Sequence, residues 1–318
     1  MARRLSEINF FFLCVGLISI LALSPLLFAL WFKTPAETFF TMPFNYVPDF
    51  YNNVSWMKDG AEGKFLITWR FSPEKFARQP AYLFWPLSGW LVSRLDLNLF
   101  VGYTLIRIFL ALVKFGALYF FLSAIFKKAA QRQLAFFLAL FLPSFYYLSP
   151  LRQILPFVTS PDLLARAFFL PHDSLAVSFL LVSAVFFNQG LREKRNQLIF
   201  WAALVILPVA ILNPAMLSFY YLFFGLAVVL FWFRQKLAWH WLVPRAGLVF
   251  GVGLPLIFYY RHLFSTALPF AWIYDQAKAI HWDINLLTYA LKIGPGAFFF
   301  PFALLIFWRR KDFLSKLI

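Results

Sequence analysis

The sequence contains little of what soluble enzymes are built from. Among its 318 residues only 13% are charged, and there are one cysteine and four histidines. Because Cys14 stands alone, an internal disulfide and a metal site made of several cysteines are excluded. The chain also lacks a Walker phosphate loop, a dinucleotide fingerprint, an HExxH helix and a nucleophile elbow. These absences leave no sequence signature of the common nucleotide-binding, zinc-dependent or serine-hydrolase enzymes.

Apolar residues take the place of the missing charges. They make up 62% of the chain, and no soluble domain hides that much apolar surface, so the bilayer must act as its solvent. A helix needs roughly 20 residues to cross about 30 Å of hydrocarbon, and the longest apolar stretches reach this length. We therefore predict an all-α polytopic bundle that forms a single transmembrane domain over residues 1–318, with about eight spans. These spans are Ile8–Phe32, Leu99–Phe126, Leu134–Leu148, Leu175–Phe187, Leu198–Leu212, Ala215–Phe233, Gly247–Tyr260 and Asn285–Trp308.

Basic residues cluster between the predicted spans and set their orientation. The net charge of +16 would suggest a nucleic-acid partner in a soluble protein, but many of these residues lie in short loops beside spans. The positive-inside rule places all five clusters in the cytoplasm, and eight crossings satisfy this with both termini inside. We predict a multi-pass inner (plasma) membrane protein with a retained signal-anchor helix and no nucleic-acid partner. The clusters are Arg3-Arg4, Lys127-Lys128 with Arg132, Arg192 to Arg195, Arg234 to Lys236, and Arg309 to Lys311.

The remaining polar segments fall on the opposite, external side. They are external loop 33–80, external loop 149–173 and external loop 261–283. The apolar segment 81–95 is too short to cross, and counting it would put Lys127-Lys128 outside, so we predict an interfacial or re-entrant helix there. Most of the 13 acids lie on this side and none lies in the middle of a span, which argues against a proton-coupled transporter. Chemistry is therefore expected at the external face.

The first external loop carries an acid among aromatic residues. Asp49 stands in the stretch Val47-Pro48-Asp49-Phe50-Tyr51. A partly desolvated carboxylate in this position acts as a general base on an incoming hydroxyl, orients that hydroxyl, or holds a divalent ion. The alternative is that Asp49 caps a helix that begins at Phe50, because Asp is a favoured N-cap residue. The two roles are compatible.

Several short motifs follow one another in a specific order. They are Asp49-Phe50-Tyr51, Asp59-Gly60 with Glu62-Gly63, Phe84-Trp85-Pro86-Leu87, Tyr103 with Arg107, Ser160-Pro161-Asp162, Pro171-His172-Asp173 and Asn213-Pro214. This order resembles the GT-C superfamily of glycosyltransferases, which use polyprenyl-phosphate sugars, and in particular a set of bacterial GT-C-like membrane proteins. The resemblance covers roughly residues 49–214 and implies a GT-C-like fold with Asp49 as the catalytic acid or base. Many members have paired acids there, whereas Phe50 follows Asp49 here.

The resemblance also implies a sugar donor whose anionic phosphate lies at the external membrane boundary. Arginine pairs with phosphate through two parallel hydrogen bonds, and Arg166 is the leading candidate. Arg152 and Arg261 bind either this phosphate or lipid headgroups. Arg107 lies seven residues before Lys114 on one helix face, and it is expected to contact the phosphate or to pair with an acid.

The other candidate residues are expected to shape the substrate site. They are Tyr51, Asp162, His172 and Asp173. His172 and Asp173 either add a metal ligand or a hydrogen-bonded pair to the site, or Asp173 caps the helix that opens near Leu175. The resemblance leaves open whether a divalent metal ion takes part as cofactor.

These expectations combine into one predicted function and two alternatives. We predict a GT-C-type hexosyltransferase that moves a sugar from a polyprenyl-phosphate-linked donor to an acceptor at the external face. The first alternative is a transporter or flippase for a lipid-linked saccharide, which needs no carboxylate base. The second is a non-catalytic assembly protein of the cell envelope, which needs no pocket that joins Asp49 to Arg166.

Overall fold

The computed structural model describes residues 2–31, 47–67, 77–141, 170–235 and 238–267, together with 271 and 275. The described part is helical and contains no strand, only an isolated antiparallel bridge between Ile67 and Gln79. The predicted all-α class is therefore confirmed. The helices are α1 (Ala2–Trp31), α2 (Val47–Ala61), α3 (Phe84–Arg94), α4 (Leu99–Ile125), α5 (Ala129–Phe141), α8 (Pro171–Glu193), α9 (Asn196–Leu212), α10 (Pro214–Gln235) and α11 (Trp239–Thr266).

Three of these helices have the length and composition of membrane spans. They are α4, α8 and α11, and shorter apolar helical stretches occur in α1, α9 and α10. The chain is thus a helical membrane protein. The predicted number of spans stays a prediction, because Asn285–Trp308 and the second half of Leu134–Leu148 lie outside the described residues.

Two helices extend beyond their predicted bounds and shorten the predicted loops. α8 begins at Pro171, so the last three residues of loop 149–173 are helical; proline suits the first turn because its missing N–H has no helical acceptor there. α11 runs through Pro244 and Pro255 and ends at Thr266, so residues 261–266 are helical where we expected a loop. Prolines of this kind are tolerated in membrane helices, where neighbouring groups satisfy the freed carbonyls.

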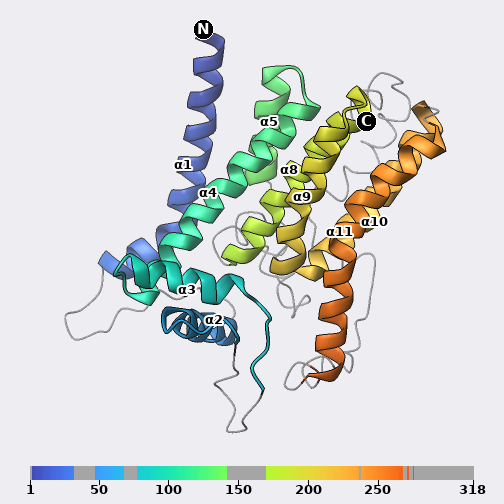
Figure 1. Cartoon of the computed structure of the whole chain (residues 1–318). Helices are drawn as coiled ribbons and strands as arrows, with labels where there is room; N and C mark the ends of the chain where they lie inside the picture. Colours follow the sequence, from blue (N-terminus) through green and yellow to red (C-terminus); the bar gives the residue numbers. More distant parts are fainter. Residues whose placement is uncertain are drawn as a thin grey trace.

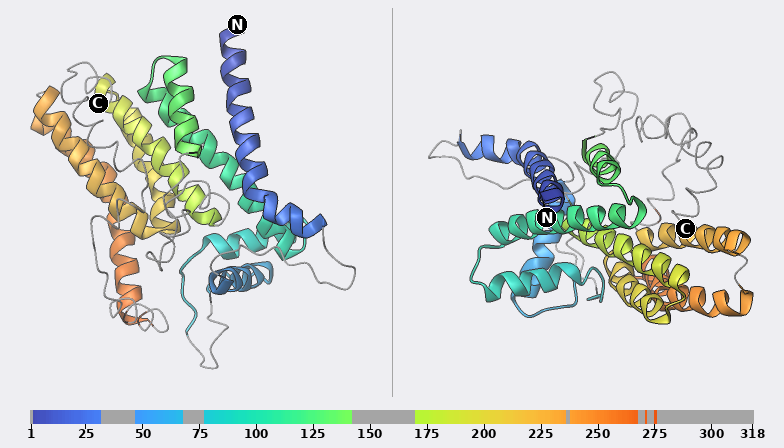
Figure 2. Two further views of the ribbon diagram at one scale, coloured as in Figure 1. Left: turned by 180° about the vertical axis from the view of Figure 1, so that it is seen from behind. Right: turned by 90° about the horizontal axis from the view of Figure 1, so that it is seen from above.

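The long helices run side by side, and two short helices cover one end of the bundle. In Figure 1, α3 lies below the lower ends of α4 and α8, α2 lies on its far side, and α11 extends downward beside them. The left view of Figure 2 keeps this order, with the start of α1, the α4–α5 turn and the α8–α9 turn at the opposite end. Those three places carry the basic clusters at Arg3-Arg4, Lys127-Lys128 and Arg192 to Arg195. We call this end of the bundle the basic end. The opposite end, which carries α2 and α3, is called the α2–α3 end.

Helix α4 presents two different faces to its surroundings. One face exposes Val101, Leu105, Phe109 and Leu112, each at least two-fifths accessible, as expected for a surface in contact with lipid. The other face is buried and holds Tyr103, Arg107 and Lys114. It packs against α8, which in turn packs against α9. A charged face turned into the bundle is what the apolar environment of a membrane helix requires.

Glycines allow α2 and α3 to pack at backbone contact. A Cβ atom at Gly60 would lie 1.8 Å from the carbonyl oxygen of Pro86, and one at Gly89 would lie 1.8 Å from the carbonyl oxygen of Met57. The two helices therefore touch along their backbones. Figure 1 shows them crossing beneath the bundle as one unit.

Candidate functional site

Four helices bring aromatic rings together at the α2–α3 end. Phe50 of α2 meets Tyr103 of α4 edge to face, with ring centroids 4.9 Å apart. Trp85 of α3 stacks on the other side of Tyr103, at 5.6 Å and 8° between the ring planes. Trp85 then meets the imidazole of His172 on α8 at 5.4 Å. Residues far apart in the sequence thus form one continuous aromatic array, which fixes the relative positions of these helices.

Arg107 lies one helical turn beyond Tyr103 on the buried face of α4. Its side chain is only 4% exposed, and its Nε has no hydrogen-bond partner in the described part of the chain. A guanidinium group at membrane depth normally finds a carboxylate or another acceptor, because an uncompensated buried charge is costly. No described carboxylate lies within ion-pairing distance of Arg107. Within the described ranges this cation therefore has no counter-ion.

Asp173 and Asn213 form a second polar contact, beside the aromatic array. The side-chain amide of Asn213 donates to Asp173 Oδ1 at 2.8 Å, and His172 Nε2 lies 3.5 Å from the same oxygen. Asn213 Oδ1 accepts the N–H of Met216, so Asn213 also caps the start of α10. The carboxylate of Asp173 lies in the first turn of α8, where the helix dipole favours negative charge. This contact joins α8 to the α9–α10 turn.

Helix α2 corrects one detail predicted for Asp49. The helix begins at Val47 rather than Phe50, so Asp49 is the third helical residue and not the residue before the helix. Pro48 is compatible with this start, because the first helical turn needs no N–H from it. The side chain of Asp49 lies outside the described residues. The next residue, Phe50, is buried against Tyr103, which places the start of α2 beside the Tyr103 turn of α4.

The structure brings together only some of the predicted site residues. Tyr51 is 41% exposed on α2, while His172 and Asp173 reach the site from α8. Arg261 is exposed in the last turns of α11. Arg152, Asp162 and Arg166 lie outside the described residues, so their predicted roles stay predictions.

Three residues of the site were not among the sequence candidates. Asn213 and the buried Asp59 of α2 appeared in the motifs without a role. The sequence suggested the headgroup boundary for Trp85, which is wrong, because its ring is only 2% exposed and packs against Tyr103 and His172. The signal for Asn213 is its position before Pro214 between two apolar segments, which is typical of a helix cap. For Trp85, an aromatic residue in a short apolar segment does not distinguish a ring in contact with lipid from a packed one.

An apolar pocket opens between α4 and α8 next to the polar residues. It has a volume of about 530 Å³, and Phe109, Leu110 and Val113 of α4 line it opposite Leu175, Phe179 and Val182 of α8. Its first lining residues follow Arg107 by two positions on α4 and Asp173 by two positions on α8. Neither Arg107 nor Asp173 is itself among the residues that line the pocket.

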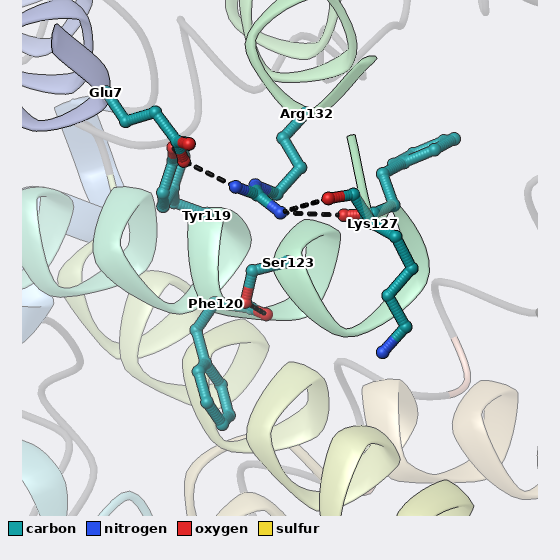
Figure 3. A network of polar contacts seen from close by, with 7 residues as sticks. Glu7, Tyr119, Phe120, Ser123, Lys127 and Arg132 are labelled. Atoms are coloured by element: carbon teal, nitrogen blue, oxygen red, sulfur yellow. Dashed lines mark hydrogen bonds and ion pairs between the residues drawn. The ribbon is translucent and has the colours of Figure 1, made fainter. Parts of the chain in front are cut away.

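A second polar cluster lies at the basic end. Glu7 of α1 accepts a hydrogen bond from Arg132 of α5 at 2.5 Å and one from the Tyr119 hydroxyl at 3.2 Å (Figure 3). Arg132 also donates to the carbonyl oxygens of Phe126 and Lys127, where α4 ends. These hydrogen bonds pair the terminal nitrogens of Arg132 and the Tyr119 hydroxyl with acceptors of the chain itself. The cluster therefore joins α1, α4 and α5 at the basic end.

Comparisons with protein-family models, with curated proteins and with solved structures gave no match. The resemblance to the GT-C superfamily therefore stays a prediction from the sequence motifs. Among the described residues, no group of three or more His, Cys, Asp or Glu side chains is placed to hold a metal ion.

Proposed function

We propose that this membrane protein transfers a sugar from a polyprenyl-phosphate donor to an acceptor at the α2–α3 end of the bundle. The observation that carries the proposal is the buried guanidinium of Arg107 on α4, whose Nε has no described partner, together with the apolar α4–α8 pocket lined by residues that follow it along the helix. A lipid-linked sugar has a negatively charged phosphate directly attached to a long apolar chain. A buried guanidinium with no partner among the described residues and an apolar pocket lined by the same helix complement the two parts of such a molecule.

Asp49 is the proposed general base of this transfer. Its carboxylate takes the proton of the acceptor hydroxyl as the hydroxyl oxygen attacks the anomeric carbon. The bond between that carbon and the phosphate oxygen breaks, and the polyprenyl phosphate leaves with the electron pair. Arg107 stabilises the charge that develops on the leaving phosphate. The packing of Phe50 against Tyr103 supports the proximity of the two residues that this mechanism needs.

The Asp173–Asn213 contact and His172 shape the donor site in this proposal. They line the side of α8 that faces the aromatic array, and their hydrogen bond holds the end of α8 against the α9–α10 turn. Arg166 and Asp162 keep their proposed roles, on the phosphate and in shaping the site. The proposed setting is the inner membrane, with both termini cytoplasmic and the α2–α3 end external.

Gene deletion and complementation test this function. In the deletion strain, mass spectrometry of lipid extracts and envelope glycans identifies the product that disappears and the polyprenyl-phosphate sugar that accumulates. Wild-type protein restores the product, whereas Asp49→Asn lowers transfer by about 10²–10⁴-fold, the usual contribution of a general base. A matched control is Glu62→Gln, because Glu62 is an exposed acid paired with Lys64 just beyond α2.

The outcome also separates the enzyme from its alternatives. If Asp49→Asn, present in the membrane at the wild-type level, fully restores the product, the catalytic proposal is wrong and a flippase for the same lipid is the better explanation. If the deletion changes no lipid-linked sugar and no glycan, both are wrong, and an assembly role in the envelope takes their place.

A further inference from the structure

Helix α3 is covered on three sides by its own chain. Gly89 and Pro86 touch the backbone of α2, Val92 fills the space beside Gly102 of α4, and Trp85 packs against Tyr103 and His172. The chain just before α3 is held as well, since the Tyr259 hydroxyl of α11 donates to the carbonyl oxygen of Pro80. These contacts fix the position and the rotation of α3 about its axis.

The fourth side of α3 is apolar and open. Leu87 is 52% exposed, Trp90 41% and Leu91 47%. Leu87 and Leu91 are four residues apart and therefore share a face, and on the helical wheel this face points away from the α2 contact. In Figure 1, α2 lies on the side of α3 that is remote from the long helices. The exposed leucines therefore lie on the side of α3 opposite α2.

We propose that this face of α3 rests on the bilayer surface, with Leu87, Trp90 and Leu91 in the boundary between headgroups and acyl chains. The proposal is independent of the sugar-transfer chemistry. It resolves the predicted choice between an interfacial and a re-entrant helix in favour of the interfacial one.

Two further observations identify a lipid surface as the occupant. The guanidinium of Arg94 lies 5.5 Å from the centre of the Trp90 ring, and a tryptophan with an adjacent cation suits the headgroup layer, where the ring faces hydrocarbon and the cation faces phosphate. The apolar face also continues along the chain through exposed Leu95 and Leu97 into the exposed stripe of α4 at Val101 and Leu105. A surface that joins the lipid-facing side of a span is expected to meet the same lipid.

The contact of α3 with the bilayer surface also determines the position of α2. Because the glycine contacts leave no space between α2 and α3, a fixed depth for α3 fixes the depth of α2 as well. The start of α2, with Asp49, is then held just outside the headgroup layer.

Site-directed fluorescence quenching tests the proposal on the full chain in proteoliposomes. Cys14 is the single native cysteine, so Cys14→Ala gives a cysteine-free background. An environment-sensitive fluorophore is attached to Leu87→Cys or Leu91→Cys, to Leu105→Cys on the lipid side of α4, and to Lys58→Cys on the exposed side of α2. Quenching is measured with spin-labelled phospholipid and with aqueous iodide. All four sites are exposed, so the substitutions remove little packing.

The labels at positions 87 and 91 are expected to be quenched by the lipid probe as strongly as the label at position 105. Iodide is expected to quench them several-fold more weakly than it quenches the label at position 58. Iodide quenching at 87 and 91 equal to that at 58 would overturn the proposal, because the face would then be in water. Protection of both labels from both quenchers would also overturn it, since another protein or a second copy of the chain would then cover α3.

Discussion

The two ends of the bundle use arginine in opposite ways. At the basic end, Arg132 is surrounded by acceptors: the Glu7 carboxylate and two carbonyl oxygens at the end of α4. Toward the α2–α3 end, Arg107 is buried more deeply, and the described residues make no hydrogen bond or ion pair with it, whereas Arg132 lacks a described partner only at its Nε. Arg132, whose two terminal nitrogens are engaged by the chain, holds the fold together, while Arg107, which has no partner among the described residues, is proposed to bind a ligand. The predictions below test this contrast.

Of the variants that test this contrast, Arg107→Met is expected to have the largest effect, a loss of activity without a loss of stability. Transfer from the lipid-linked donor should fall by about 10²–10³-fold, as for the loss of one group that stabilises charge in a transition state. Stability should stay the same or rise by about 1–4 kcal/mol, because an apolar side chain replaces an uncompensated buried charge. Donor turnover in proteoliposomes and thermal unfolding in detergent measure the two quantities.

A loss of stability together with activity would contradict this assignment, since Arg107 would then be part of the fold. Arg107→Lys is the matched variant. It keeps the charge but cannot form two parallel hydrogen bonds with a phosphate, so its activity should fall between those of the wild type and Arg107→Met.

Arg132→Met is expected to show the reverse pattern. The change leaves Glu7 without its cation and removes the cap from the end of α4, which should lower the free energy of unfolding by about 3 kcal/mol, as for breaking a largely buried ion pair. Donor affinity of the protein that remains folded should be unchanged. Thermal unfolding and equilibrium binding of the lipid-linked donor check the two halves of the prediction.

A double-mutant cycle with Glu7→Gln sharpens this test. Because Glu7 and Arg132 are in direct contact, their coupling energy should lie at about 0.5–3 kcal/mol. A cycle between Glu7 and Arg107 serves as the control and should give no coupling. Coupling in the control cycle would show that the two ends of the bundle are not independent.

The sequence predicted the all-α class of the fold because this class depends on composition and apolar periodicity, and the predicted orientation in the membrane stays a prediction. Apolar runs are local patterns, and they located α4, α9 and α10 to within about two residues, whereas α1 begins six residues before its predicted start and α8 ends six residues after its predicted end. The starts of α8 and α2 were placed too late, because Pro171 and Pro48 were not recognised as first-turn residues. The length of α11 was underestimated because Pro244 and Pro255 interrupt its pattern without ending the helix.

The candidate site was harder to predict than the fold because its contacts join residues far apart in the chain. The sequence placed Arg107 on a helix face with Tyr103, and that placement agrees with the structure. It gave no indication that Trp85 would stack on Tyr103 or that Asn213 would reach Asp173. Such contacts depend on how α3 and the α9–α10 turn pack against α4 and α8, and neither motif spacing nor hydropathy contains that information.

Gly89→Ala is expected to have an intermediate effect, confined to the α2–α3 end. The added methyl group would lie 1.8 Å from the carbonyl oxygen of Met57, so the two backbones must separate, at a cost of about 1–3 kcal/mol. Gly16→Ala in α1 is the matched control. No atom lies within 4 Å of its added methyl group, and the better helix propensity of alanine should make it neutral or stabilising by about 0.5–1 kcal/mol. Thermal unfolding of both variants measures the difference, and equal stabilities would show that α2 and α3 are not in backbone contact.

Asn213→Ala is expected to have the smallest effect, and it separates two roles of one side chain. The variant loses the cap on the Met216 N–H and the hydrogen bond to Asp173, so stability should fall by about 1–2 kcal/mol. Asn213→Ser keeps a capping oxygen but has no amide donor for Asp173, so it should recover only the capping share of this loss. If the Asp173 contact also positions the donor site, Asn213→Ser should still bind the lipid-linked donor more weakly than the wild type, although its unfolding temperature is nearly restored. Full recovery of both quantities would assign Asn213 to the helix cap alone and leave Arg107 as the polar group on which donor binding depends.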